Sequence, residues 1–175
     1  DVDAALYWLG RMLEGGADPR YVARRLLRMA SEDIGMADPR ALEQVVASAH
    51  TVEHMGMPEC ELALAQATVY VALAAKSNAL YLAYGEVKRE VARRPGLAIP
   101  LAIRNAPTEL MREAGYGEGY RYAHDEEGAV AELECLPAEI VGTRFYHPTA
   151  YGWEARIRER LAEIRTLRAS KRSKP

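Results

Sequence analysis

The spacing of His50, Glu53 and His54 is a pattern that could hold a metal ion. It matches H-x-x-E-H, in which two histidines one helical turn apart bind zinc and the glutamate acts as a general base. The neighbouring apolar residues oppose this interpretation, because at about 100° per residue both histidines lie away from the stripe that faces the core. That stripe comprises Leu42, Val45, Val46, Ala49 and Val52. We therefore interpret these three residues as part of a solvated helix face. A small hydrolase that uses them is a further hypothesis, ranked third after the two given at the end of this section.

The segment from Pro100 to Asp125 combines a turn, three glycines, three tyrosines and the pair His124-Asp125, with no helical or strand period. Long ordered loops of this kind often carry function. In one interpretation the glycines permit tight turns, the tyrosines pack onto helices, and His124-Asp125 forms a hydrogen-bonded corner. In the other, the loop is an interface for a partner. The candidate interface residues are Arg104, Asn105, Tyr116, Tyr120, Arg121 and Tyr122.

Other catalytic patterns are weak. The glycine-rich stretch 115–120 lacks the lysine of a phosphate-binding loop and does not follow a strand and open a helix. We therefore expect this chain neither to bind a cofactor nor to hydrolyse ATP. Cys60 and Cys135 lack C-x-x-C spacing, and we interpret both as reduced, partly buried thiols. A Cys-His pair of Cys60 with His124 or His147 would need a proximity that sequence cannot show.

Length and composition indicate a globular protein. The chain has 175 residues, 49% of them hydrophobic and 27% charged, and no apolar run is long enough to span a membrane. The sequence starts without methionine and without a secretory signal, so we expect a fragment of a longer cytoplasmic protein.

Positive charge is concentrated at the end of the chain. The net charge is −2, but from Gly152 onward eight Lys or Arg residues stand against three Glu. An amphipathic helix with a solvated charged face would explain this, and so would contact with phosphates. The candidate DNA contacts are Arg156, Arg160, Arg168, Lys171 and Arg172.

Apolar periodicity and helix-start signals predict an all-α, compact multi-helix domain with long ordered loops and few or no strands. Asp18-Pro19 and Asp38-Pro39 each place a capping carboxylate before a proline suited to the first helical turn. An alanine-rich helix that is apolar nearly all round should lie at the centre of the fold. We predict helices at residues 3–13, 19–34, 39–55, 58–75, 77–93, 107–114 and about 149–168, brief strand pairing of 132–136 with 143–146 at most, and disorder from Ser170.

Four strings carry a resemblance to a known family. They are residues 3–35 (DAALYWLGRMLEGGADPRYVARRLLRMASEDIG), 56–85 (GMPECELALAQATVYVALAAKSNALYLAYG), 104–125 (RNAPTELMREAGYGEGYRYAHD) and 146–161 (YHPTAYGWEARIRERL). The chain resembles the C-terminal part of the replication-associated recombination protein A (RarA/MgsA) family of AAA+ ATPases, whose eukaryotic relative is the Werner helicase-interacting protein.

The resemblance implies that residues 1–25 end a lid-associated helical region, that 26–168 form an oligomerisation domain, and that 169–175 are a flexible basic tail. It also implies a homotetramer, an upstream ATPase domain that binds ATP and Mg, and contacts with DNA and single-strand DNA-binding protein at stalled forks. A cytoplasmic, nucleoid-associated location follows from the same likeness. No catalytic residue of the family matches a position in this chain.

Two hypotheses therefore lead. The first is a non-catalytic homo-oligomerisation module of a replication-linked ATPase. The second is a module that contacts DNA or single-strand-binding protein through the basic last helix and the Arg/Tyr loop.

Overall fold

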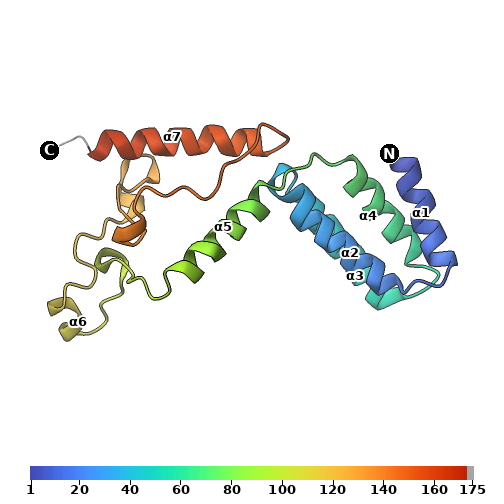
Figure 1. Cartoon of the computed structure of the whole chain (residues 1–175), viewed down its shortest axis with the longest axis horizontal. Coiled ribbons are helices and arrows are strands. Elements are labelled where there is room, and N and C mark those ends of the chain that lie inside the picture. The colour runs from blue at the N-terminus through green and yellow to red at the C-terminus, as the bar shows by residue number, and fades with distance from the viewer. Residues whose placement is uncertain (173–175) are drawn as a thin grey trace. The chain divides into compact units, whose positions relative to one another are not determined.

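The computed structural model describes residues 1–172, and it confirms the predicted all-α fold class (Figure 1). The described residues contain helices and irregular loops but no β-strand. They form two compact units, each discontinuous in sequence. Unit 1 comprises residues 1–85 and 146–158, and unit 2 comprises residues 86–145 and those from 159 onward. No helix within residues 1–172 combines the length and apolar content needed to cross a membrane.

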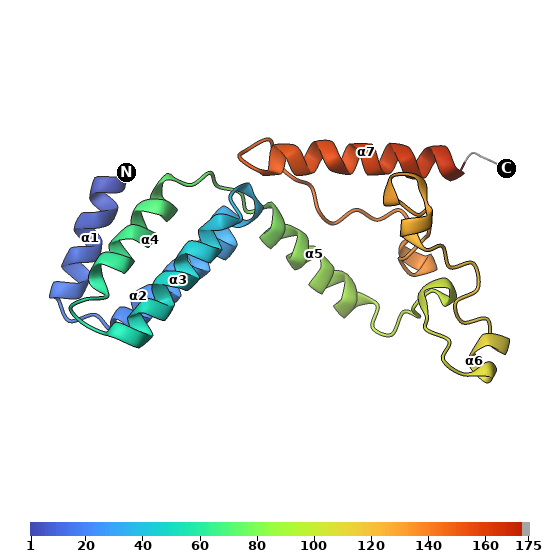
Figure 2. The ribbon, with the colours of Figure 1, turned by 180° about the vertical axis from the view of Figure 1, so that it is seen from behind.

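Unit 1 is built on four helices that lie side by side, as Figures 1 and 2 both show. They are α1 (Val2–Glu14), α2 (Pro19–Met29), α3 (Arg40–Met55) and α4 (Glu61–Leu73). The alanine-rich α4 contacts α1, α2 and α3, which confirms its predicted central position. Small side chains on α4 allow this close approach. The fully buried core residues include Ile34, Ala41, Val45, Cys60 and Leu64.

The predicted aspartate caps are present. The Asp18 carboxylate accepts a hydrogen bond from the Arg20 N–H at 2.8 Å, and Asp38 accepts one from the Arg40 N–H at 3.1 Å. Asp38 also accepts the Tyr70 hydroxyl at 3.0 Å, which ties the start of α3 to α4. Between α2 and α3 the chain forms a π-helical turn, η1 (Ala30–Ile34), and a 3-10 turn, η2 (Gly35–Ala37).

Two details of the predicted helices were wrong. The buried stripe of α3 is Ala41, Val45, Ser48 and Val52, so Leu42 and Val46 are about 40% exposed rather than buried. Pro58 lies in a turn, and α4 begins only at Glu61.

Helices α5 (Ala79–Arg93) and α7 (Glu154–Arg172) each begin in unit 1 and end in unit 2. Ser77 caps α5, because its Oγ accepts the Ala79 N–H at 3.2 Å. The last helix begins at Glu154 rather than near residue 149, since residues 149–153 form a loop. It continues to Arg172, so residues 170–172 are helical instead of disordered; residues 173–175 of the predicted flexible tail lie outside the described part.

Unit 2 consists of the end of α5, the short α6 (Glu109–Glu113), loops, four 3-10 turns and most of α7. The 3-10 turns are η3 (Leu101–Ile103), η4 (Ala123–Asp125), η5 (Glu127–Ala129) and η6 (Ala138–Ile140). The brief strands considered for 132–136 and 143–146 are absent. In residues 132–136, side chains bind backbone groups that a second strand would otherwise use. Arg168 donates to the Leu133 carbonyl, and the Glu134 carboxylate accepts the Leu136 N–H.

The predicted domain division remains a prediction. Residue 25 lies inside α2, and Leu9, Val22 and Leu64 share one hydrophobic core. Within unit 1, residues on both sides of the proposed boundary therefore pack together.

Gly152 provides a test of how tightly the loop before α7 fits unit 1. Its φ is +53°, and a Cβ there would overlap the Ala37 carbonyl and lie 2.9 Å from the Ala75 Cβ. We expect Gly152→Ala to reduce the free energy of unfolding by about 2–4 kcal/mol, combining overpacking with left-handed strain. The control is Gly56→Ala, which shares positive φ (+71°) but has no heavy atom within 4 Å of the added Cβ. Equal losses for both variants in urea unfolding would contradict the tight fit.

Candidate functional site: a buried carboxylate and two exposed surfaces

Glu154, the first residue of α7, is fully buried in unit 1 and accepts four hydrogen bonds. Its Oε2 accepts the Ser77 hydroxyl at 2.6 Å, the Thr149 hydroxyl at 2.7 Å and the Thr149 N–H at 2.9 Å. Its Oε1 accepts the Tyr146 hydroxyl at 2.7 Å. These donors are all neutral, so the carboxylate is held by hydrogen bonds and by the positive end of the α7 dipole.

The electrostatics of this site favour an ionised carboxylate. Burial by itself raises the pKa of the Glu154 carboxyl, but the hydrogen bonds from Ser77, Thr149 and Tyr146 outweigh it and leave that pKa below its ordinary value. Burial and the bond to Glu154 raise the pKa of the Tyr146 phenol, which therefore stays protonated as a donor. The arrangement fits a structural role, since both carboxylate oxygens accept hydrogen bonds from groups within the chain.

The Glu154 network joins two segments that the sequence resemblance singled out separately. Ser77 belongs to the start of α5, whereas Tyr146 and Thr149 precede α7. The backbone N–H of Trp153 donates to the Ala37 carbonyl at 2.7 Å and so joins a third segment to the other two. Sequence reasoning missed Glu154 because a glutamate in the first turn of a helix is ordinarily exposed. The usable signal was a carboxylate close after several hydroxyl residues in an otherwise apolar stretch.

This network fixes the loop that carries Tyr151 and Trp153. Both rings remain substantially exposed, at 65% and 46%, and the Arg156 guanidinium lies 4.9 Å from the centre of the Trp153 ring. Exposed Trp, Tyr and Arg side chains on a rigid loop are the residue types enriched at interface hot spots.

The second candidate surface is the loop of unit 2 that contains residues 104–122. Arg104 packs over the Tyr116 ring at 5.0 Å and donates to the Ile99 carbonyl at 2.7 Å, so this pair is internal to the loop. The glycines at 115, 117 and 119 all have positive φ, as the tight-turn interpretation requires.

The tyrosines of this loop differ in position. Tyr116 is half-buried, but Tyr120 and Tyr122 are 57% and 54% exposed, so these two do not pack onto helices as the first interpretation of the loop expected. Asn105 and Arg121 are also exposed, and Arg121 pairs with Glu126 at 2.6 Å. The His124-Asp125 corner is a 3-10 turn whose histidine ring lies 5.0 Å from the Tyr122 ring. Participation of these residues in an interface remains a prediction.

The candidate DNA contacts on α7 fall into two groups. Arg156 and Arg160 are exposed, with Arg160 paired to Glu163 at 3.0 Å. Arg168, Lys171 and Arg172 are instead bound to residues 126–134 of unit 2. Sequence analysis did not anticipate this internal pairing.

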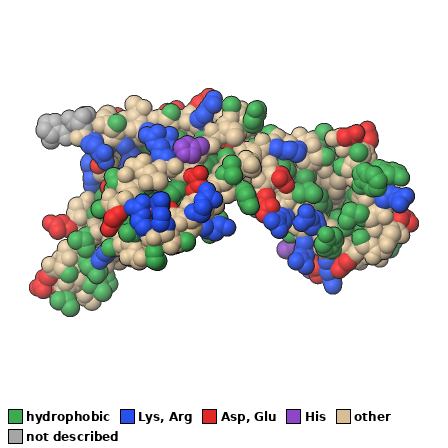
Figure 3. All heavy atoms as spheres, in the orientation of Figure 1, with side chains coloured by type: hydrophobic (Ala, Val, Ile, Leu, Met, Phe, Trp, Pro, Cys, Tyr) green, Lys and Arg blue, Asp and Glu red, His purple; other side chains and the backbone are tan. Residues whose placement is uncertain are grey.

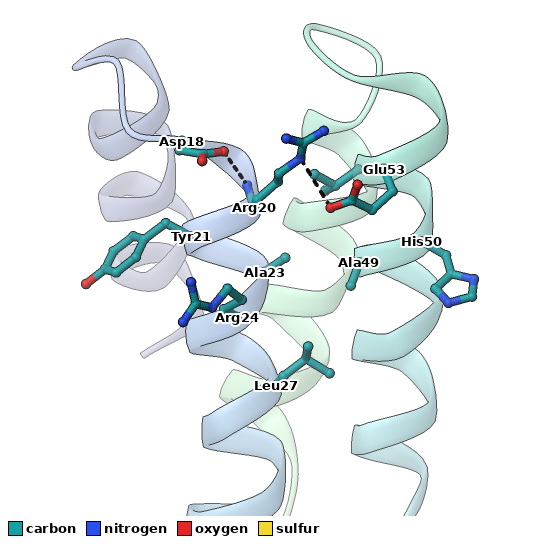
Figure 4. Close-up of a pocket in the computed structure, with 10 residues that line it drawn as sticks. Asp18, Arg20, Tyr21, Ala23, Arg24, Leu27, Ala49, His50 and Glu53 are labelled. Atoms are coloured by element: carbon teal, nitrogen blue, oxygen red, sulfur yellow. Dashed lines mark hydrogen bonds and ion pairs between the residues drawn. The ribbon is translucent and has the colours of Figure 1, made fainter.

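The possible metal motif lies on the exposed side of α3. His50 and His54 are solvent-exposed as predicted, with ring centres 6.2 Å apart. Glu53 pairs with Arg20 at 3.2 Å across a shallow groove of about 370 Å³ between α2 and α3, and His50 lies among the residues that line this groove (Figure 4). Residues 1–172 contain no group of three His, Cys, Asp or Glu side chains placed to hold a metal ion.

The two cysteines have different environments. Cys60 is completely buried beside Met57, and burial raises the pKa of its thiol, which makes it a poor nucleophile. Cys135 was expected to be partly buried, but it is exposed, because residues 131–136 form a surface loop rather than a packed strand.

These features define an all-α module whose main polar site serves to position loops. Residues 1–165 match the family model described as MgsA AAA+ ATPase C terminal, and the chain belongs to this family. It is 54% identical over 168 residues to a replication-associated recombination protein A of Coxiella burnetii, covering 95% of this chain and 38% of that protein. The Escherichia coli K12 protein of the same name is 51% identical over 161 residues, covering 91% and 36%.

A eukaryotic protein shows the same likeness. ATPase WRNIP1 of Dictyostelium discoideum is 43% identical over 148 residues, which is 83% of this chain and 17% of that protein. The chain thus spans less than two fifths of the length of these relatives. The resemblance read from the sequence is confirmed at the level of the family.

Glu154 supplies a prediction about stability and its pH dependence. We expect Glu154→Gln to lower the free energy of unfolding by about 1.5–3 kcal/mol at pH 7, because one of the two acceptor oxygens is lost. Glu154→Ala should cost about 3–5 kcal/mol, since the donors then lie buried without a partner. Chemical denaturation monitored by circular dichroism measures both.

The pH dependence follows from the lowered pKa of Glu154. Its stabilising contribution is complete above the ordinary value of 4.5 and is lost as the pH falls below it. The difference between the wild-type chain and Glu154→Gln should therefore be constant from pH 7 to about pH 5 and shrink in stronger acid. A difference that grows on acidification would contradict an ionised buried carboxylate.

Proposed function

We propose that this chain is a non-catalytic homo-oligomerisation module of an AAA+ ATPase of the RarA/MgsA family, and that it forms a tetramer. The observation that carries the proposal is the start of α5. Leu80, Tyr81, Leu82 and Tyr84 are all between 43% and 62% exposed there, while only Ala79 and Ala83 are buried. A helix that is apolar on nearly every side is normally covered by other protein.

Other apolar side chains of unit 1 support the same proposal. Leu62 and Leu73 of α4 are 78% and 70% exposed, and eleven residues, or about three turns, separate them, so they share one helix face. On α1, Tyr7 and Trp8 stack edge to face and are also more than half exposed. Figure 3 shows hydrophobic side chains gathered over α1 on the visible surface of unit 1. Obligate homo-oligomer interfaces are more apolar than ordinary surface.

The greater length of the relatives supports the proposal that this module belongs to a larger protein. We infer an upstream ATPase domain that binds ATP and Mg, so that oligomerisation of the module would gather several ATPase domains and multiply weak DNA contacts. The relatives' name supports a role in replication-associated recombination, for which we propose action at stalled forks, with DNA and single-strand DNA-binding protein as partners in the cytoplasm, at the nucleoid.

The mass of the chain in solution tests the proposal directly. Multi-angle light scattering at micromolar concentration should give four times 19.4 kDa. We expect Tyr81→Glu combined with Leu82→Glu to weaken association roughly a thousandfold, if each substitution costs about 2 kcal/mol at the interface.

A matched control separates the α5 surface from general effects of added charge. Tyr21→Glu with Leu110→Glu exchanges the same residue types at positions that are 53% and 75% exposed in α2 and α6. This control should keep the wild-type mass. A wild-type chain that is monomeric at micromolar concentration would refute oligomerisation, and an unchanged mass for the α5 variant would exclude α5 from the interface.

The outward arginines of α7 favour a second candidate function, binding of nucleic acid. Arg156, Arg158, Arg160 and Arg165 are all exposed. Within residues 1–172, neither Arg158 nor Arg165 forms an ion pair with a carboxylate. Exposed guanidinium groups along one helix can track a phosphate backbone and release its counterions.

The salt dependence of binding tests this second function. A fluorescent oligothymidine of 30 nucleotides serves as the probe, titrated between 50 and 200 mM salt. Arg156→Gln, Arg158→Gln and Arg165→Gln together should reduce the slope of log affinity against log salt by about 2, at roughly 0.7 per lost phosphate contact. An unchanged slope would remove these arginines from the binding surface.

A further inference from the structure

The last turn of α7 is bound to an acidic segment of unit 2 through Lys171. Its ammonium group donates to the Val130 carbonyl at 2.6 Å, the Glu127 carbonyl at 2.9 Å and the Glu126 carboxylate at 3.2 Å. The Lys171 side chain is only 10% exposed. An ammonium group has three protons to donate, so its hydrogen-bonding capacity is fully used inside the chain.

Two more cations on the same turns bind the same segment. Arg168 donates to the Leu133 carbonyl at 2.6 Å, and Arg172 pairs with Glu132 at 2.8 Å and approaches Glu134 at 4.0 Å. Figure 2 shows this segment beside the end of α7. We call Arg168, Lys171 and Arg172 the cation cluster, and residues 125–134 the acidic segment.

The acidic segment is itself held in place and charged. Glu126 accepts a second cation, because Arg121 pairs with its other carboxylate oxygen at 2.6 Å. The hydrogen bonds from Arg121 and Lys171 lower the pKa of the Glu126 carboxyl, which is therefore ionised at neutral pH. Carboxylate and backbone oxygens thus occupy the same donors that a phosphate chain would use.

Position along α7 separates these cations from the outward arginines. Arg156, Arg158, Arg160 and Arg165 lie toward the start and middle of the helix and are exposed, whereas two of the three residues in the cation cluster are partly buried. Arg172 keeps a 65% exposed side chain, so the edge of the cluster is open to solvent. A polyanion that reaches the exposed arginines would meet the cluster next along the helix.

We propose that the acidic segment is an intramolecular competitor for the cation cluster, so that single-stranded nucleic acid contacts the cluster only when the segment leaves α7. This inference rests on the second proposed function, nucleic-acid binding by α7. Exposed ion pairs are individually weak and are screened by salt, so a densely charged strand is able to replace those of Arg172. The enclosed Lys171 then sets how readily the segment leaves.

Neutralising the acidic segment tests the competition. Glu126→Gln, Glu132→Gln and Glu134→Gln together should raise the affinity for the 30-nucleotide oligothymidine on the order of tenfold or more at 50 mM salt. The substitutions leave the carbonyl contacts of Arg168 and Lys171 in place, so these two cations become available only as the weakened segment leaves α7. The slope of log affinity against log salt should then steepen by up to about 2. The control, Glu109→Gln with Glu113→Gln and Glu118→Gln, removes three exposed carboxylates near α6 and should leave the slope unchanged.

Lys171→Gln, made both in the wild-type chain and in the neutralised variant, gives a second readout, because the same change in charge is compared in both. In the wild-type chain this substitution should change the salt slope little, because Lys171 already binds the acidic segment. In the neutralised variant it should reduce the slope by about 0.7. Circular dichroism confirms that each variant keeps the helical content of the wild-type chain.

The outcomes separate the inference from the function on which it rests. Equal slopes for the neutralised variant and its control overturn the competition, as does an equal effect of Lys171→Gln in both backgrounds. If the variant with Arg156→Gln, Arg158→Gln and Arg165→Gln also binds as the wild type does, the proposal that α7 binds nucleic acid is refuted as well. If that variant loses affinity while the neutralised variant behaves like its control, nucleic-acid binding by α7 stands and the competition is refuted.

Discussion

The buried carboxylate of Glu154 is the constraint on which the arrangement of unit 1 depends. A charged group in a protein interior is unfavourable unless polar partners surround it, and Glu154 obtains those partners from the start of α5 and from the loop before α7. The hydrogen bonds are directional, so they determine where each segment lies in a way that apolar packing does not. The exposed ring of Trp153 and the tight fit of Gly152 against Ala37 both follow from this fixed loop.

The end of α7 is held by a different kind of interaction. Its cations bind carbonyl and carboxylate oxygens, and water and salt compete most for the contacts of Arg172, whose side chain is exposed. The exposed contacts of Arg172 exchange easily, whereas the Glu154 network is shielded from solvent. Helix α7 therefore begins in a buried hydrogen-bond network and ends in ion pairs that are partly exposed to solvent. This contrast is consistent with the positioning of a loop at one end of α7 and with the contact to a charged partner that we propose for the other.

The sequence predicted the helices well because their signals are local. Asp18 and Asp38 cap helices as expected, Ser77 caps α5, and the alanine-rich composition of α4 indicated its central place. The family was also recognised from the sequence. The sites were not predictable in the same way, because Glu154 meets Ser77 across 77 residues and Lys171 meets Val130 across 41. No periodicity within a helix reports on partners so far away, and a charged residue on a helix gives no local sign of whether water or protein surrounds it.

The discontinuity of unit 1 has a consequence for synthesis on the ribosome. Helices α1 to α4 are complete by residue 73, but the segment that closes the unit follows only after the whole of residues 86–145. At about 5–20 residues per second, the Ser77 hydroxyl waits roughly 4–15 seconds for its partner carboxylate to be translated. During that interval the surface around Ala37 and Ala75 is open to chaperones, to a neighbouring nascent chain, or to premature contacts, and the order of translation becomes part of how this fold is reached.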